Sequence, residues 1–253
     1  MAKDEAKTVE AAMDFLNSEA GQGYDGMGAD QFAPVFINIL HSTAPEQQEG
    51  TPEYVPGAKF GDFFNSMTRK SYGKSIEVVP LKCEEAWLEW APNNGGLRGR
   101  HAPGSIKVTG DPYGKQFTDS GNEIIEYMMF YVLVVGEFEN GVAVFSLKKS
   151  GMKHGKTWNT RIRSVKLPNG AMAPYYSSVW KLTSMLNKND KAQTWYNIGV
   201  GKTTGAERVR FITPDDLPVI KTSREQVVSS KGISLAAIEG GSTLAITDNN
   251  AEY

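Results

Sequence analysis

The segment at residues 124–138 most strongly limits the folds that are open to this chain of 253 residues. It is rich in Ile, Val, Tyr and Phe, side chains that favour a pleated and largely buried strand. An Asn140-Gly141 pair follows, which is a strong signal for a type I′ turn, and it leads into a second β-prone segment at residues 142–148. We therefore expect a long, curved β-hairpin rather than a buried helix.

Other segments extend this β-rich pattern. Strands are expected at residues 34–40, 75–90, 175–185 and 195–200. Pro80 interrupts the second of these, and because proline cannot donate to a sheet ladder it predicts an edge position or a bulge. Residues 92–104 contain Gly, Asn and Pro throughout, so we expect a long loop there, with Arg98 and Arg100 at its tip.

Helical patterns are few. Residues 5–18 place apolar side chains on one face and acids on the other, which predicts an N-terminal helix. Residues 157–166 predict a short helix that buries Trp158 and Ile162 and ends before the turn signal at residues 168–170. One more helix is expected within residues 214–229, and residues 230–253 read as a disordered tail.

These elements describe a mostly β chain with a few helices. Their order fits an OB-like five-stranded Greek-key barrel with long loops, an N-terminal helix and a flexible C-terminal tail, and a β-sandwich is the competing architecture. We divide the chain into an acidic N-terminal helix and linker at residues 1–30, an OB-like nucleic-acid-binding domain at 31–212, and a C-terminal helix with a disordered tail at 213–253.

The net charge of −2 conceals a strong segregation of charge. Residues 1–58 carry −8, residues 59–211 carry +9, and residues 212–253 carry −3. Within residues 141–211, thirteen Lys and Arg face only two acids, and Phe, Trp and Tyr are interleaved with them. Cations neutralise phosphates and flat rings stack on unpaired bases, so this pattern favours a binder of single-stranded nucleic acid. Buried aromatics beneath a solvated lysine surface are the alternative interpretation.

Motifs for catalysis are missing from the sequence. It contains no G-x-S-x-G or H-E-x-x-H run, and the stretch GVGKTTG lacks the glycine of a phosphate loop, since Tyr196 stands five residues before Gly201. The basic region has no group of Asp residues for magnesium. One cysteine, Cys83, expected in the core, and three His make a disulfide framework or a zinc cluster implausible. We expect a binding protein that is not an enzyme and needs no metal or cofactor.

The chain shows no membrane or secretion signal. Its beginning lacks a basic segment followed by an apolar one, and its most apolar run, at residues 127–135, is far shorter than the roughly 20 residues that span a bilayer. These features predict a cytoplasmic protein that does not contact membranes.

Three basic groups supply the candidate binding residues. The largest lies at residues 148–166, which contain seven cations and no acid. The others lie around Tyr72 and in the loop at residues 92–104. The candidate phosphate-binding residues are Arg69, Lys70, Lys74, Arg98, Arg100, Lys148, Lys149, Lys153, Lys156, Arg161 and Arg163. The candidate stacking residues are Tyr72, Trp180, Trp195 and Tyr196.

Two parts of the sequence resemble bacteriophage-encoded single-stranded DNA-binding proteins. One is the run FGDFFNSMTRKSYGKSIEVVPL followed by AWLEW, and the other is the succession of SGMKHGKTWNT, PYYSSVWKLTS and NKNDKAQTWYNIGV. The resemblance spans roughly residues 32–212. It implies an OB-type barrel that coats and protects unpaired DNA during phage replication or recombination, in the cytoplasm of the infected bacterium.

The same resemblance implies partners as well as DNA. Replication or recombination proteins would be recruited through the acidic termini, and the oligomeric state stays open. Two alternatives also remain open: a phage structural or assembly protein with a basic face, and a single-strand annealing protein.

Deleting residues 1–30 tests whether this acidic segment competes with DNA for the basic region. The truncated chain is then expected to bind an oligonucleotide more tightly and with a steeper dependence on salt, because an internal anion no longer has to be displaced. Titration of the oligonucleotide at several salt concentrations measures both quantities. Unchanged affinity would contradict the competition.

Overall fold

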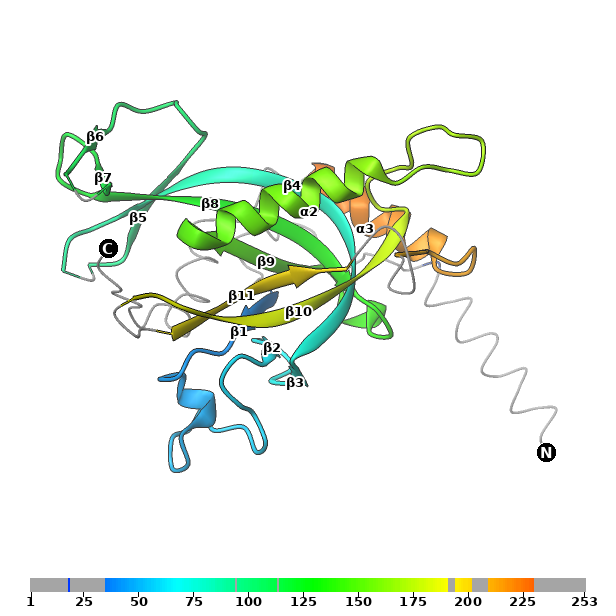
Figure 1. Ribbon diagram of the computed structural model, residues 1–253, viewed down its shortest axis with the longest axis horizontal. Coiled ribbons are helices and arrows are strands. Elements are labelled where there is room, and N and C mark those ends of the chain that lie inside the picture. The colour runs from blue at the N-terminus through cyan, green and yellow to red at the C-terminus, as the bar shows by residue number, and fades with distance from the viewer. Residues whose placement is uncertain are drawn as a thin grey trace.

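In the computed structural model, the described residues are 18, 35–93, 95–112, 114–190, 194–201 and 209–229. The expected N-terminal helix, its linker and the expected C-terminal tail lie outside these residues, apart from position 18. The described chain forms one large curled sheet with a helix on each face (Figure 1).

The sheet has twelve strands within the described residues, and its main path runs β11-β10-β4-β8-β9-β1-β2-β3. All neighbours are antiparallel except β1, which lies parallel to β9. Strands β5, β6, β7 and β12 branch from this path. The strands of the path are β1 (Val35–Ile39), β2 (Phe63–Asn65), β3 (Ser71–Gly73), β4 (Ser75–Trp90), β8 (Glu123–Val134), β9 (Ala143–Lys148), β10 (Ser178–Lys188) and β11 (Thr194–Val200). The branches are β5 (Leu97–His101), β6 (Thr109–Gly110), β7 (Gln116–Phe117) and β12 (Arg210–Phe211).

The expected mostly β class is confirmed, but the five-stranded OB-like barrel is wrong. The sheet is mixed, has more than five strands and curls into a half-barrel (Figure 1). The alternative of a β-sandwich is also wrong, because the strands of the described chain form one sheet and not two. Strand periodicity shows which residues face each side but not which strands pair. Part of the error came from residues 92–104, where the expected loop contains strand β5 paired with the end of β4.

The long hairpin is confirmed, with a different turn. β8 and β9 pair antiparallel, but Val132 faces Ala143 and a 3-10 helix, η3 (Phe138–Asn140), lies in the connection. A type I′ turn requires positive φ at both central residues, and of the Asn-Gly pair only Gly141 has it, at 71°. Asn140 instead donates through Nδ2 to Glu137 Oε2 at 3.2 Å, which holds the wider connection.

The bulge expected at Pro80 is confirmed. The register between β4 and β8 shifts between Pro80 and Lys82. β4 lies between β10 and β8, but its ladder with β10 ends at Val78, so among the described strands only β8 pairs with β4 at Pro80. A bulge solves the problem because it leaves one residue of the strand out of the hydrogen-bond ladder.

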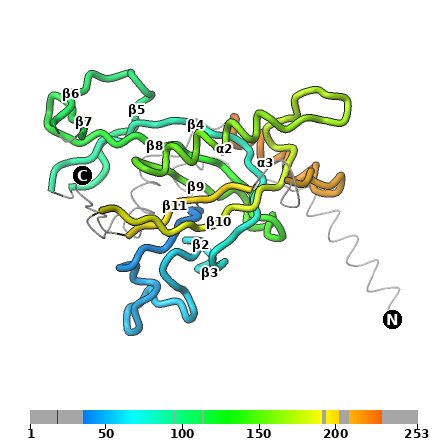
Figure 2. Tube along the Cα trace, in the orientation of Figure 1, coloured from blue at the N-terminus to red at the C-terminus, as the bar shows by residue number. Residues whose placement is uncertain are grey.

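Helix α2 (Met152–Ser164) carries the chain from β9, on one side of β8 and β4, to β10 on the other (Figure 2). The helix expected at residues 157–166 is therefore confirmed in kind, but it begins five residues earlier. Trp158 is 0% exposed, and its ring stacks on Phe130 of β8 with centroids 4.4 Å apart. The side chains around these two rings form the α2-side cluster, which includes Phe63, Phe145, Trp180, Leu182 and Ile198.

The other face of the sheet is covered by helix α3 (Leu217–Ser229), in the range expected for a helix. Its Ile220 and Val227 join Leu81, Leu88 and Leu133 in the α3-side cluster. Successive residues of a strand point to opposite faces, so β4 and β8 contribute side chains to both clusters. In the described chain, neither helix is long and apolar enough to cross a membrane.

Gly155 allows α2 to approach the sheet closely. A Cβ atom at this position would overlap Met128 Sδ and lie 3.1 Å from Leu147 Cδ1. Gly155→Ala is expected to lower the free energy of unfolding by about 1–3 kcal/mol through overpacking. Helix propensity alone would raise the free energy of unfolding by up to about 1 kcal/mol, because alanine favours a helix more than glycine does.

Urea denaturation measures this difference. Thr160→Ala, on the exposed face of the same helix, is the control and should change the free energy of unfolding by no more than about 0.5 kcal/mol. A Gly155→Ala variant more stable than the wild type would contradict the close approach.

Candidate nucleic-acid interface

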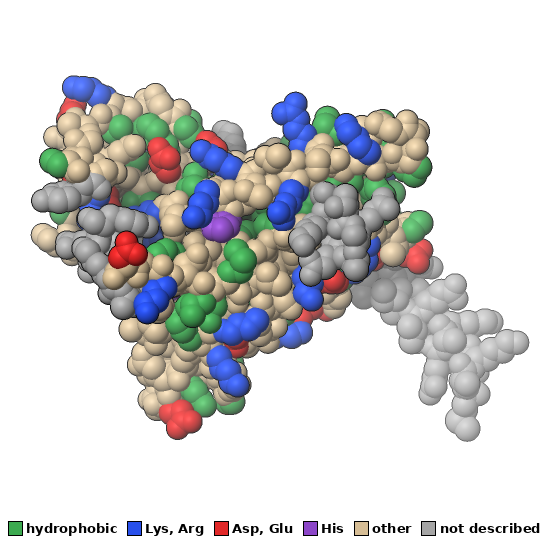
Figure 3. Space-filling view, in the orientation of Figure 1, with side chains coloured by type: hydrophobic (Ala, Val, Ile, Leu, Met, Phe, Trp, Pro, Cys, Tyr) green, Lys and Arg blue, Asp and Glu red, His purple; other side chains and the backbone are tan. Residues whose placement is uncertain are grey.

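One face of α2 is exposed and carries cations and hydroxyls without a carboxylate. At about 100° per residue, these side chains fall within about a third of the helix circumference. Figure 3 shows blue Lys and Arg side chains along this helix. We call this face the α2 stripe; its exposed members are Lys153, Lys156, Thr157, Thr160, Arg163 and Ser164.

The cations of the stripe are not neutralised by acids of the described chain. No ion pair of the described chain involves Lys153, Lys156 or Arg163. The same holds for Lys149, which is exposed just before the helix. The first turn of α2 also contains no acid. The positive end of the helix dipole therefore adds to the side-chain charge there. The stripe is suited to binding a polyanion.

Two candidate residues that are close to the stripe in sequence do not belong to it. Arg161 donates to the carbonyl oxygens of Val200 and Gly201, at 2.5 and 3.2 Å, and so fastens α2 to the end of β11. Lys148 places its ammonium 5.7 Å from the ring centre of Tyr127, which belongs to the α3-side cluster. Lys148 thus lies on the opposite face of the sheet.

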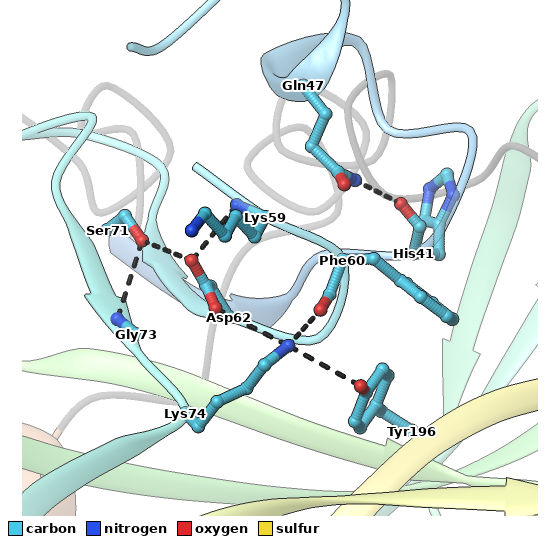
Figure 4. A network of polar contacts seen from close by, with 9 residues as sticks. All are labelled: His41, Gln47, Lys59, Phe60, Asp62, Ser71, Gly73, Lys74 and Tyr196. Atoms are coloured by element: carbon cyan, nitrogen blue, oxygen red, sulfur yellow. Dashed lines mark hydrogen bonds and ion pairs between the residues drawn. The ribbon is translucent and has the colours of Figure 1, made fainter. Parts of the chain in front are cut away.

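The second basic group, around Tyr72, is held by internal contacts. Figure 4 shows Lys74 between Asp62, the carbonyl of Phe60 and Tyr196. Its Nζ is 3.5 Å from Asp62 Oδ1 and 4.5 Å from the ring centre of Tyr196. Asp62 is 5% exposed and also accepts from the Ser71 hydroxyl at 3.0 Å. Lys74 therefore stabilises this corner of the fold.

Lys70 and Tyr72 share one carboxylate. The Tyr72 hydroxyl donates to Glu137 Oε2 at 2.6 Å, and Lys70 forms an ion pair with Glu137 Oε1. Burial and this hydrogen bond raise the pKa of Tyr72 to about 12. Neighbouring Arg69 donates to the carbonyl of Glu53. The predicted stacking residue Tyr72 is thus anchored by its hydroxyl.

The third basic group, Arg98 and Arg100, does not lie beside the α2 stripe either. Arg100 forms an ion pair with Glu84, which further contacts Lys82 at 3.0 Å and accepts from the hydroxyl of Tyr131. Tyr131 belongs to the α3-side cluster, so this network lies on the face away from α2. Arg98 is exposed on the same strand as Arg100, in the lobe of β5, β6 and β7 (Figure 1).

The predicted aromatic residues differ in their access to solvent. Trp180 is 0% exposed in the α2-side cluster, so its ring cannot stack on a ligand from the surface. Tyr196 is half-buried, with its ring edge-on to Phe60 at 4.7 Å. Trp195 is half-buried on β11. It shares a face with Asn197, whose Nδ2 donates to Ser150 Oγ at 3.5 Å, so Trp195 lies near the beginning of α2.

A groove beside the C-terminal half of α2 was not predicted. The Tyr175 hydroxyl donates to Asn159 Oδ1 at 2.7 Å, and Asn159 Nδ2 donates to Cys83 Sγ at 3.3 Å. Burial raises the pKa of the Cys83 thiol to about 11. The sequence indicated a core thiol at Cys83, but it carried no signal that Asn159 and Tyr175 would meet it. The described residues hold no group of three metal-ligating side chains.

The shared carboxylate of Glu137 generates a prediction on pH. Burial alone raises its pKa, but the hydrogen bonds from Lys70 and Tyr72 outweigh burial and hold the pKa below 4.5. A lowered pKa in the folded state contributes stability above the unfolded pKa and loses it as the pH falls through the folded value. Glu137→Gln should therefore cost about 1–3 kcal/mol at pH 7 and progressively less below pH 4.5.

Urea denaturation across this pH range measures the effect. The control is Glu139→Gln, an exposed carboxylate in the same connection, which should stay within about 0.5 kcal/mol of the wild type. A loss for Glu137→Gln that stays constant down to pH 3 would contradict the assigned role.

Comparison with known proteins identifies a family. No curated protein and no solved structure matches the chain. Residues 3–210 match the family described as Pam3 phage gp34-like protein. This match covers most of the chain. It includes helix α2, the α2 stripe and every strand of the described sheet apart from the last residue of β12. The phage origin implied by the resemblance is thereby supported: the chain belongs to the Pam3 phage gp34-like protein family.

Proposed function

We propose that this protein binds single-stranded DNA without sequence preference and coats and protects it during phage replication or recombination. The observation that carries the proposal is the α2 stripe, whose cations have no acidic partner among the described residues. The other two basic groups are largely held by internal acids and carbonyls. The proposed role requires neither catalysis nor a cofactor.

The dimensions of the stripe suit a DNA backbone. From Lys153 to Arg163 the helix advances about 15 Å, at about 1.5 Å per residue. A strand carries one phosphate per roughly 3.4 Å when stacked, so about four phosphates span this length. Lysine offers a compact charge that does not read bases, which favours tolerance of sequence.

Trp195 supports a preference for unpaired strands. It lies half-buried near the beginning of α2, and the part of its ring that reaches the solvent can stack on a base that is not paired. Such stacking contributes about 1–3 kcal/mol per base, and a duplex keeps its base faces covered. Phosphate contacts along α2 and stacking at Trp195 would therefore act on one strand.

The test removes the cations of the stripe together. In the triple variant Lys153→Ala, Lys156→Ala, Arg163→Ala, the slope of log K against log salt should become shallower by about 2, at about 0.7 per phosphate contact. Fluorescence titration of oligo-dT at several salt concentrations measures the slope.

A matched triple variant controls for the loss of net charge. Lys107→Ala, Lys115→Ala, Lys221→Ala removes the same charge from the β5–β7 lobe and α3, and should leave the slope unchanged. An unchanged slope in the stripe variant would overturn the proposal. Equal affinity for duplex of the same length would favour an assembly protein instead, and accelerated pairing of complementary strands would favour an annealing protein.

A further inference from the structure

The groove beside α2 has the size of a small-ligand site. Its volume is about 560 Å³, and it lies between β4, β8, the C-terminal half of α2 and the loop that follows the helix. Figure 1 shows this loop extending beyond the curved strand β4. Ligand pockets usually fall between about 300 and 1,000 Å³. The lining residues that matter below are Cys83, Glu85, Met128, Asn159, Arg163, Met172 and Tyr175.

The walls of the groove are mostly apolar and include a flexible thioether. Met128 is buried, whereas Met172 is 59% exposed. Methionine sulfur packs favourably against aromatic rings. A flat aromatic ligand would cover Met172 and gain this contact.

Asn159 supplies an amide whose donors are poorly used. Its Nδ2 contacts only sulfur in the described residues, namely Cys83 Sγ at 3.3 Å and Met128 Sδ at 4.0 Å. Sulfur is a weak acceptor, so a carbonyl or ring nitrogen would be a stronger partner. The hydrogen bond from Tyr175 to Asn159 Oδ1 fixes the orientation of the amide. The groove thus combines a surface for a ring with a donor for its polar edge.

Arg163 connects the groove to the α2 stripe, because it belongs to both. A phosphate held at Arg163 would place the attached base at the mouth of the groove. The exposed carboxylate of Glu85 also lines the groove and disfavours entry of the phosphate itself. This arrangement of charge distinguishes the two ends of a nucleotide.

We propose that the groove binds one unpaired nucleobase of the strand whose phosphates lie along α2. The base packs on Met172 and its polar edge accepts from Asn159 Nδ2. The inference rests on the proposed function, because the phosphate contacts of the stripe deliver the base.

The first experiment compares two methionines of equal exposure. Met172→Ala should weaken binding of oligo-dT by about fivefold or more, which corresponds to the lower limit of about 1 kcal/mol for a stacked base. Met67→Ala is the control, since Met67 is 60% exposed on the connection between β2 and β3. An abasic deoxyribose-phosphate oligomer of the same length should bind both variants and the wild type alike.

The second experiment uses Cys83, which is the only cysteine of the chain and lines the groove. Saturating oligo-dT should slow alkylation of the full-length protein by iodoacetamide by about fivefold or more. The abasic oligomer at saturation should leave the rate unchanged, because phosphate contacts alone do not fill the groove.

The outcomes separate the inference from the proposed function. The base site would be overturned, and DNA binding left intact, if the wild type bound both oligomers but two differences were missing. These are a larger effect of Met172→Ala on the affinity for oligo-dT than for the abasic oligomer, and slower alkylation of Cys83 with oligo-dT than with the abasic oligomer. Failure of the wild type to bind oligo-dT would overturn the proposed function and the base site with it.

Discussion

The contact between Trp158 and Phe130 fixes how the candidate interface is presented. The sheet buries a large apolar surface on this face, and α2 covers it by placing Trp158 and Ile162 inward. A helix rotated by half a turn would bury Lys153 and Lys156 instead, at a cost of several kcal/mol for each uncompensated charge. The packing of one indole thus determines which side chains of α2 face the solvent, and Gly155 determines how close the helix lies.

Counting charges along the chain overstates the basic surface. Lys70, Lys74 and Arg100 each meet an acid that is distant in sequence: Glu137, Asp62 and Glu84, respectively. These ion pairs fasten loops and strands of the fold, and they leave little positive charge at those positions for a ligand. The cations of the α2 stripe differ because the helix contains no acid, and no ion pair within the described residues involves them.

Local patterns predicted much of the secondary structure. The strands near residues 34–40 and 75–90 and the helix within residues 214–229 follow from periodicity and from Pro and Gly signals, which act over a few residues. The pairing of β1 with β9 and the crossover of α2 depend on contacts between distant segments, so the barrel type could not be derived. Strand β5 was also hidden, because it is short and lies within a segment rich in Gly, Asn and Pro.

The same distinction holds for the candidate site. Lys153, Lys156 and Arg163 were predicted because they belong to a run of seven cations without an acid at residues 148–166. The internal role of Tyr72 and the burial of Trp180 depend on partners that only the fold supplies.

The parallel pairing of β1 with β9 also sets an order of events during synthesis. β1 precedes its neighbour by about a hundred residues, so it cannot complete this ladder until the ribosome has made β9. Until then, the buried side chains Val35 and Ile37 have only β2 and its surroundings to cover them. The nascent chain is consequently most exposed to misassociation while β4 and β8 are being made.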